Sequence, residues 1–113
     1  MKRYCLALDL KENENTIKAY DDYHKQVWPE VKDSLKEAGI LDMEIYRTQN
    51  RLFMIIKTAP DFSFEKKAEM DKANSRVQEW ETLMSQFQQP LPGSKPGEKW
   101  LLMDRVFKLE PGE

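Results

Sequence analysis

The chain contains a single histidine, His24, which lies four residues after Tyr20 and four residues before Trp28. Histidine is the one side chain whose unperturbed pKa lets it give or take a proton near neutral pH. Proton-transfer chemistry at pH 7 that needs no perturbed carboxylate or lysine must therefore use His24. We expect a catalytic site, if the chain has one, to be built around this residue.

On a helix, Tyr20 and His24 would be neighbours on one face, because residues four apart lie one turn from each other. The nearby phenol and indole would make the surroundings of the imidazole partly apolar and lower its pKa. Asp21 and Asp22 are expected to lie mostly on other faces. The alternative is a structural histidine at a boundary between helix and sheet, and spacing alone does not choose between the two.

The many aromatic side chains of this small chain are candidates either for contacts with a sugar or for the core. It has three tryptophans and four tyrosines, whose flat rings can cover the C–H faces of a sugar while their N–H and O–H groups bond its hydroxyls. Candidates for such contacts are Trp28, Tyr46 and Trp80. The alternative is that these rings fill the core, which the helical spacing around Trp80 also fits.

Other chemistries have little support in the sequence. Four glycines form no phosphate-binding loop, and no Ser-His-Asp or Cys-His arrangement has a recognisable context. One cysteine and one histidine cannot make a tetrahedral zinc site. Cys5 falls within a predicted strand, where it is expected to be a small buried residue. We therefore predict a reaction that uses no metal and no cofactor.

Length and charge set further limits. We expect 113 residues to form one domain, 1–113, with a thin core. Eighteen basic and 20 acidic residues are spread along the chain without a basic stripe, which argues against a nucleic-acid partner. No apolar stretch approaches the ~20 residues that span a bilayer, and no secretory leader is recognisable. A soluble, cytoplasmic protein without a membrane partner is expected.

The hydrophobic pattern of the first half predicts a strand, a broken helix and a hairpin. Residues alternate from Arg3 to Leu10, as in a strand. Capping residues at 13–16 begin a helix that Pro29 interrupts at Trp28 and that Gly39 ends. Two strands, Leu41–Thr48 and Arg51–Lys57, then read as a hairpin.

The second half is predicted to add helices and a last strand. A helix begins near Asp61 or Ser63, and another covers Asn74–Phe87. Proline and glycine make Gln88–Gly97 a loop. Trp100–Leu109 is the final strand, and the tail Glu110–Glu113 is expected to fray.

This order predicts an α+β fold, a ferredoxin-like βαββαβ sandwich with one four-stranded antiparallel sheet. Helices cover only one face of such a sheet, yet the first strand carries Cys5 and Ala7 opposite its leucines. The uncovered face therefore needs another surface. A second copy of the chain is the simplest candidate, so we expect a homodimer that packs sheet to sheet into a dimeric α/β barrel.

The spacing of Tyr20, His24 and Trp28-Pro29-Glu30 resembles the L-rhamnose mutarotase family. Further similarity covers most of the chain, in the segments Ile45-Tyr46, Leu52-Phe53-Met54, Trp80 with Met84, and Val106-Phe107. The resemblance implies a dimeric ferredoxin-like barrel that interconverts the α and β anomers of a 6-deoxyhexose without a cofactor.

The resemblance also implies roles for single residues. His24 would be the acid/base residue, Tyr20 a group that hydrogen-bonds the substrate, and Trp80 an aromatic wall of the pocket. Met43 and Glu81 stand where rhamnose enzymes tend to have a sugar-contacting tyrosine and a second tryptophan, so both join the expected substrate-binding set. These departures concern the identity of the sugar more than the reaction. We expect L-rhamnose as the substrate, with L-fucose as the alternative.

Two other functions fit the same fold. One is a cofactor-free monooxygenase that oxidises a polycyclic phenol, which would need a large apolar cavity. The other is a non-catalytic sugar-binding module, which would bind a sugar without changing its rate of anomer exchange.

Overall fold

The computed structural model describes residues 1–110, so the predicted tail from Pro111 onward lies outside the described residues. No helix within this range is long and apolar enough to cross a membrane. The elements are β1 (Lys2–Leu10), α1 (Glu14–Tyr23), a 3₁₀ turn (His24–Gln26), α2 (Pro29–Glu37), β2 (Ile40–Thr48), β3 (Arg51–Thr58), α3 (Phe64–Ala73), α4 (Ser75–Ser85), β4 (Gln88–Gln89) and β5 (Leu101–Leu102).

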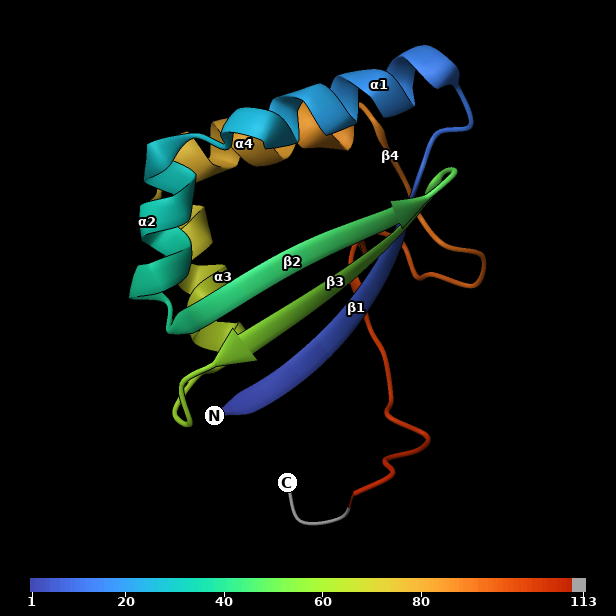
Figure 1. The fold of residues 1–113 in the computed structure, drawn as a ribbon. Coiled ribbons are helices and arrows are strands. Elements are labelled where there is room, and N and C mark those ends of the chain that lie inside the picture. Colours follow the sequence, from blue (N-terminus) through green and yellow to red (C-terminus); the bar gives the residue numbers. More distant parts are fainter. Residues whose placement is uncertain (111–113) are drawn as a thin grey trace.

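One antiparallel sheet organises the chain. Its strand order is β2-β3-β1-β4, and β5 pairs with the same edge of β1 as β4 but nearer the middle of that strand. Together β4 and β5 occupy the fourth strand position of a βαββαβ arrangement. The helices gather on one side of the sheet (Figure 1). The predicted α+β, ferredoxin-like fold is confirmed.

Local sequence signals explain the broken helix before the hairpin. The side chain of Asn13 caps α1 by accepting hydrogen bonds from the main-chain N–H groups of Asn15 and Thr16. Trp28 has extended dihedrals because it precedes Pro29, which is the first residue of α2. Gly39 follows α2 with a φ of +96°, a conformation that favours glycine. The predicted two-piece helix is confirmed.

The helix-facing side of the sheet carries the core in two clusters. One lies under α1, α2 and α4 and contains the site described below; its buried members are Leu10, Tyr20, Val31, Leu52, Trp80 and Met84. The other lies at the opposite end of the strands and contains Leu6, Ile40, Ile56 and Phe62. Because strand side chains alternate, the other face of β1 and β3 carries Cys5, Ala7, Phe53 and Ile55, which are only partly buried.

The end of the chain differs from the sequence prediction. Gln88–Gln89, predicted to be loop, pair with the end of β1 as β4. The predicted strand Trp100–Leu109 is regular only at Leu101–Leu102, and one further main-chain hydrogen bond joins Met103 to Cys5. Beyond that point the chain runs away from the sheet (Figure 1). An apolar segment forms a strand only where it pairs with a neighbouring strand, and beyond Met103 this segment pairs with none among the described residues, although β4 and β5 leave the edge of β1 at residues 2–4 unused.

Candidate active site

A cavity of about 190 Å³ opens between the end of α1 and the β2–β3 hairpin. Helix α1 and the turn after it contribute one wall, and the two strands contribute the other. The lining residues are Tyr20, Asp21, His24, Lys25, Ile45, Arg47 and Leu52. His24 and Tyr20, the two residues that the sequence put at the centre of the site, therefore share this cavity.

His24 is held in one tautomer by the helix that precedes it. Its Nδ1 atom lies 2.9 Å from the main-chain carbonyl oxygen of Tyr20. A carbonyl oxygen can only accept a hydrogen bond, so Nδ1 carries the proton and donates it. The neutral ring then has its lone pair on Nε2, which makes no hydrogen bond within residues 1–110. His24 is thus set up as a base through Nε2.

Aromatic rings surround the imidazole of His24. The ring of Tyr20 stacks on it with centroids 4.2 Å apart, and the indole of Trp80 meets it edge-on at 5.5 Å. Burial among these rings lowers the pKa of His24, while the carbonyl of Tyr20 and the charge of Asp21 act in the opposite direction. The imidazole is therefore neutral at pH 7.

Tyr20 is a hydrogen-bonding group and not a ready proton source. Its side chain is only 3% exposed, and burial raises the pKa of its phenol far above the ordinary value, with the charge of Asp21 adding to the shift. The side chain of Gln88, which lies close to the phenol, acts against this shift. The phenol therefore keeps its proton across the physiological range.

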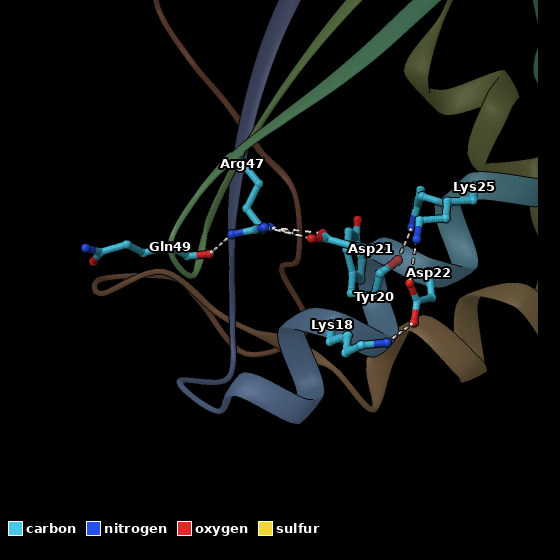
Figure 2. Close-up of polar contacts among 8 residues, drawn as sticks. Lys18, Tyr20, Asp21, Asp22, Lys25, Arg47 and Gln49 are labelled. Carbon is cyan, nitrogen blue, oxygen red and sulfur yellow. Dashed lines mark hydrogen bonds and ion pairs between the residues drawn. The ribbon is translucent and has the colours of Figure 1, made fainter.

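Sequence reasoning missed the charged pair at the cavity. Asp21 was expected to lie on another face, but it lines the cavity and pairs with Arg47 from β2 at 2.7 Å. Figure 2 shows Arg47 between Asp21 and the main chain of Gln49. Two signals were available: Asp21 is three residues before His24, and residues three apart are also helix neighbours. Arg47 follows Ile45 at the two-residue spacing of one strand face.

Trp80 packs against the imidazole of His24, and Trp28 packs against Trp80, but neither tryptophan lines the cavity. Trp80 is buried in α4, and Trp28 meets its ring edge-on with centroids 5.1 Å apart. The guanidinium of Arg76 lies 3.8 Å over the ring of Trp28. Both indoles are thus part of the packing around the imidazole, and neither Trp28 nor Trp80, for which the resemblance implies an aromatic wall of the pocket, is among the residues that line this cavity.

Three other expected contacts lie away from the cavity. Met43 packs against the second core cluster, at the far end of the sheet. Tyr46 points to the uncovered face, is 53% exposed and donates a hydrogen bond to Glu44, because it alternates with Ile45 along β2. Glu81, on α4, accepts a hydrogen bond from Gln78 and does not line the cavity either.

The cavity does not resemble a metal centre or a large apolar chamber. Within residues 1–110, no group of three or more His, Cys, Asp or Glu side chains is placed to hold a metal ion. Three of the seven lining residues, Asp21, Lys25 and Arg47, have ionisable side chains. A cavity of about 190 Å³ suits a small molecule better than the polycyclic phenol of the monooxygenase alternative.

Comparison with known proteins adds the family. A model of the L-rhamnose mutarotase family matches residues 3–109. The L-fucose mutarotase of Xanthomonas campestris is 44% identical over 96% of this chain and 89% of its own length. The crystal structure of the L-rhamnose mutarotase from Formosa agariphila has a TM-score of 0.70 at 26% identity, covering 97% of this chain and all of its own. A dimeric ferredoxin-like protein from an uncultured marine organism, 16% identical with a TM-score of 0.60 over 96% of this chain and 98% of its own, shares the fold. The chain therefore belongs to the L-rhamnose mutarotase family and is an isomerase that interconverts sugar anomers.

Proposed function

We propose that this protein interconverts the α and β anomers of a 6-deoxy-L-hexose by ring opening and reclosure at His24. The observation that carries the proposal is the Nε2 of a neutral imidazole, which makes no hydrogen bond within residues 1–110 and is held by the Nδ1 hydrogen bond at the wall of the cavity. L-Fucose becomes the first sugar to test, ahead of L-rhamnose, because the L-fucose mutarotase relative is 44% identical.

The reaction needs one proton to leave the hydroxyl on C1 and one to reach the ring oxygen. Nε2 of His24 takes the hydroxyl proton as the bond between C1 and the ring oxygen breaks, and the imidazolium gives a proton to that oxygen. Both oxygens are bonded to C1, so one nitrogen can serve both. Rotation about the C1–C2 bond and the reverse transfers give the other anomer. Positioned proton transfer of this kind contributes roughly 10² to 10⁴ in rate.

Within this scheme, the phenol of Tyr20 donates a hydrogen bond to the sugar. Its raised pKa keeps the proton on the phenol, and its ring lies against His24. Trp28 and Trp80 act by holding the imidazole in place, and Met43, Tyr46 and Glu81 make no contact with the sugar inside the single chain. The reaction needs no metal or cofactor in this scheme.

Saturation-transfer NMR on the anomeric protons tests the function. The purified protein should accelerate exchange between anomers of L-fucose, L-rhamnose or both above the rate in buffer. Binding of these sugars without faster exchange would favour a sugar-binding module and contradict the proposal.

The homodimer is part of the proposal. Its support is the uncovered sheet face with Phe53 and Ile55, together with the apolar side chains of the last described segment. Val106 is 96% exposed and Phe107 73% exposed in the single chain, which is unusual for two adjacent apolar residues. A second copy that packs on the sheet would cover these groups.

Sedimentation tests the dimer. The protein is expected to be dimeric at micromolar concentration, and Phe53→Asp should shift it to monomer. The substitution Glu12→Gln, at an exposed position before α1, is the control and should leave the dimer intact. A monomeric wild type would contradict the dimer.

The single cysteine forms no internal disulfide, which fits the cytoplasm, the location that we propose.

A further inference from the structure

The ion pair between Asp21 and Arg47 is built more rigidly than an ordinary surface pair. Nε of Arg47 lies 2.9 Å from Oδ1 of Asp21, and Nη2 lies 2.7 Å from Oδ2, so the contact is bidentate. Nη1 donates to the main-chain carbonyl of Gln49 at 2.8 Å. The guanidinium is therefore fixed from two sides.

A second acidic residue on the same helix shows the contrast. Asp22 binds Lys18 at 2.9 Å and Lys25 at 3.0 Å, and both lysines are highly exposed. Figure 2 shows Asp22 and Lys25 on the side of Asp21 that is away from Arg47. Asp22 does not line the cavity, whereas Asp21 does. The two adjacent aspartates thus have different surroundings and allow a matched comparison.

Both members of the Asp21–Arg47 pair line the cavity and keep hydrogen-bonding capacity that the pair itself does not use. Three of the five guanidinium N–H groups are used by Asp21 and Gln49, which leaves two. A carboxylate offers about four acceptor sites, so Asp21 can also accept from a ligand. One hydroxyl of a bound sugar can accept from Arg47 while its neighbour donates to Asp21.

We propose that Asp21 and Arg47 together bind two neighbouring hydroxyl groups of the sugar and thereby determine which 6-deoxyhexose the enzyme accepts. The inference rests on the proposed function, since it places the sugar in the cavity beside His24. L-Fucose and L-rhamnose differ in configuration at C2 and C4, so a fixed donor and acceptor in the cavity can distinguish them. Charged groups that hydrogen-bond a hydroxyl discriminate strongly against a sugar that lacks it.

The test combines enzyme variants with altered sugars. Arg47→Met, Asp21→Asn and the control Asp22→Asn are compared with the wild type on the preferred sugar and on analogues that lack the hydroxyl at C2, C3 or C4. Anomer exchange gives KM and kcat, and ligand-observed NMR gives the dissociation constants. Circular dichroism confirms that each variant is folded.

In the wild type and in Asp22→Asn, removal of a recognised hydroxyl should weaken binding about tenfold or more. In Arg47→Met and Asp21→Asn, the dissociation constant of the complete sugar should already be raised about tenfold or more. Removal of the recognised hydroxyl should then cause no further increase. The change should appear in KM more than in kcat. Two results would overturn the inference. One is that Arg47→Met and Asp21→Asn lose the same affinity for every sugar and analogue, and the other is that these two variants discriminate between the sugars as the wild type does.

The same measurements separate this inference from the proposed function. A wild type that binds sugars without accelerating exchange contradicts the function, while the comparison of dissociation constants still decides the role of the pair. A wild type that binds none of the sugars contradicts both.

Discussion

The imidazole of His24 and the main-chain carbonyl of Tyr20 are joined by a hydrogen bond of 2.9 Å. The bond arises because α1 ends at Tyr23, so that His24 turns back onto the last turn of the helix. It leaves Nε2 as the basic nitrogen of the neutral ring. The chemistry that we propose follows from this relationship.

The pH dependence of the reaction should report His24. Burial lowers its pKa below the ordinary value of about 6.5, and the reaction begins with the neutral ring. We expect kcat/KM for anomer exchange to be level near pH 7 and to fall only at pH values below about 6.5. A midpoint at or above 6.5 would show that the imidazole is not shielded in the way described.

Asp21→Asn should move this acid limb to still lower pH. The charge of Asp21 stabilises the protonated imidazole and so raises the pKa of His24. Without the charge, the pKa falls further. The midpoint of the pH–rate profile measures the shift, with Asp22→Asn as the control that should leave it in place. An upward shift in Asp21→Asn would contradict the assigned electrostatics.

Folding stability should depend on pH through the same residue. The pKa of His24 is lowered in the native state and ordinary in the unfolded chain, so below about pH 6.5 the unfolded state binds more protons. The contribution of His24 is thus fully present above that pH and is lost as the pH falls through the native pKa. Urea unfolding of wild type and His24→Gln between pH 7 and 5 measures the difference in the free energy of unfolding. The difference in the free energy of unfolding should become smaller as the pH falls from 7 to 5. A difference that stays constant over this range would argue against burial of the His24 imidazole.

Tyr20→Phe separates the phenol hydroxyl from the ring that stacks on His24. The ring is buried and should stay in place, so the variant should fold with a loss of about 0.5–1.5 kcal/mol in the free energy of unfolding. Loss of the hydrogen bond to the sugar should raise KM about tenfold. Unchanged kinetics in the folded variant would remove the hydroxyl from the site.

The fold could be predicted largely from the sequence because its signals are local. The alternation in β1, the cap at Asn13, the break before Pro29 and the positive φ at Gly39 each depend on neighbouring residues. The last strand could not be predicted in the same way. Its residues are apolar enough for a strand, but whether they pair depends on β1, which lies about 95 positions earlier in the chain, and no local pattern reports that pairing.

The site was predictable only where its residues are close in sequence. Tyr20 and His24 follow from the four-residue spacing of a helix. Arg47 comes from a strand 26 positions after Asp21, and no local pattern joins them. The residue type of Tyr46 makes it a candidate for a sugar contact, and strand alternation puts it on the opposite face of the sheet from Ile45, which lines the cavity.

Anomer exchange by His24→Gln is the most direct test of the central claim. Glutamine fills similar space but cannot take up a proton, so the rate measured by saturation-transfer NMR should fall roughly 10² to 10⁴-fold. The dissociation constant of the sugar and the circular dichroism spectrum should stay close to those of the wild type. A folded His24→Gln variant that exchanges anomers at the wild-type rate would contradict the account.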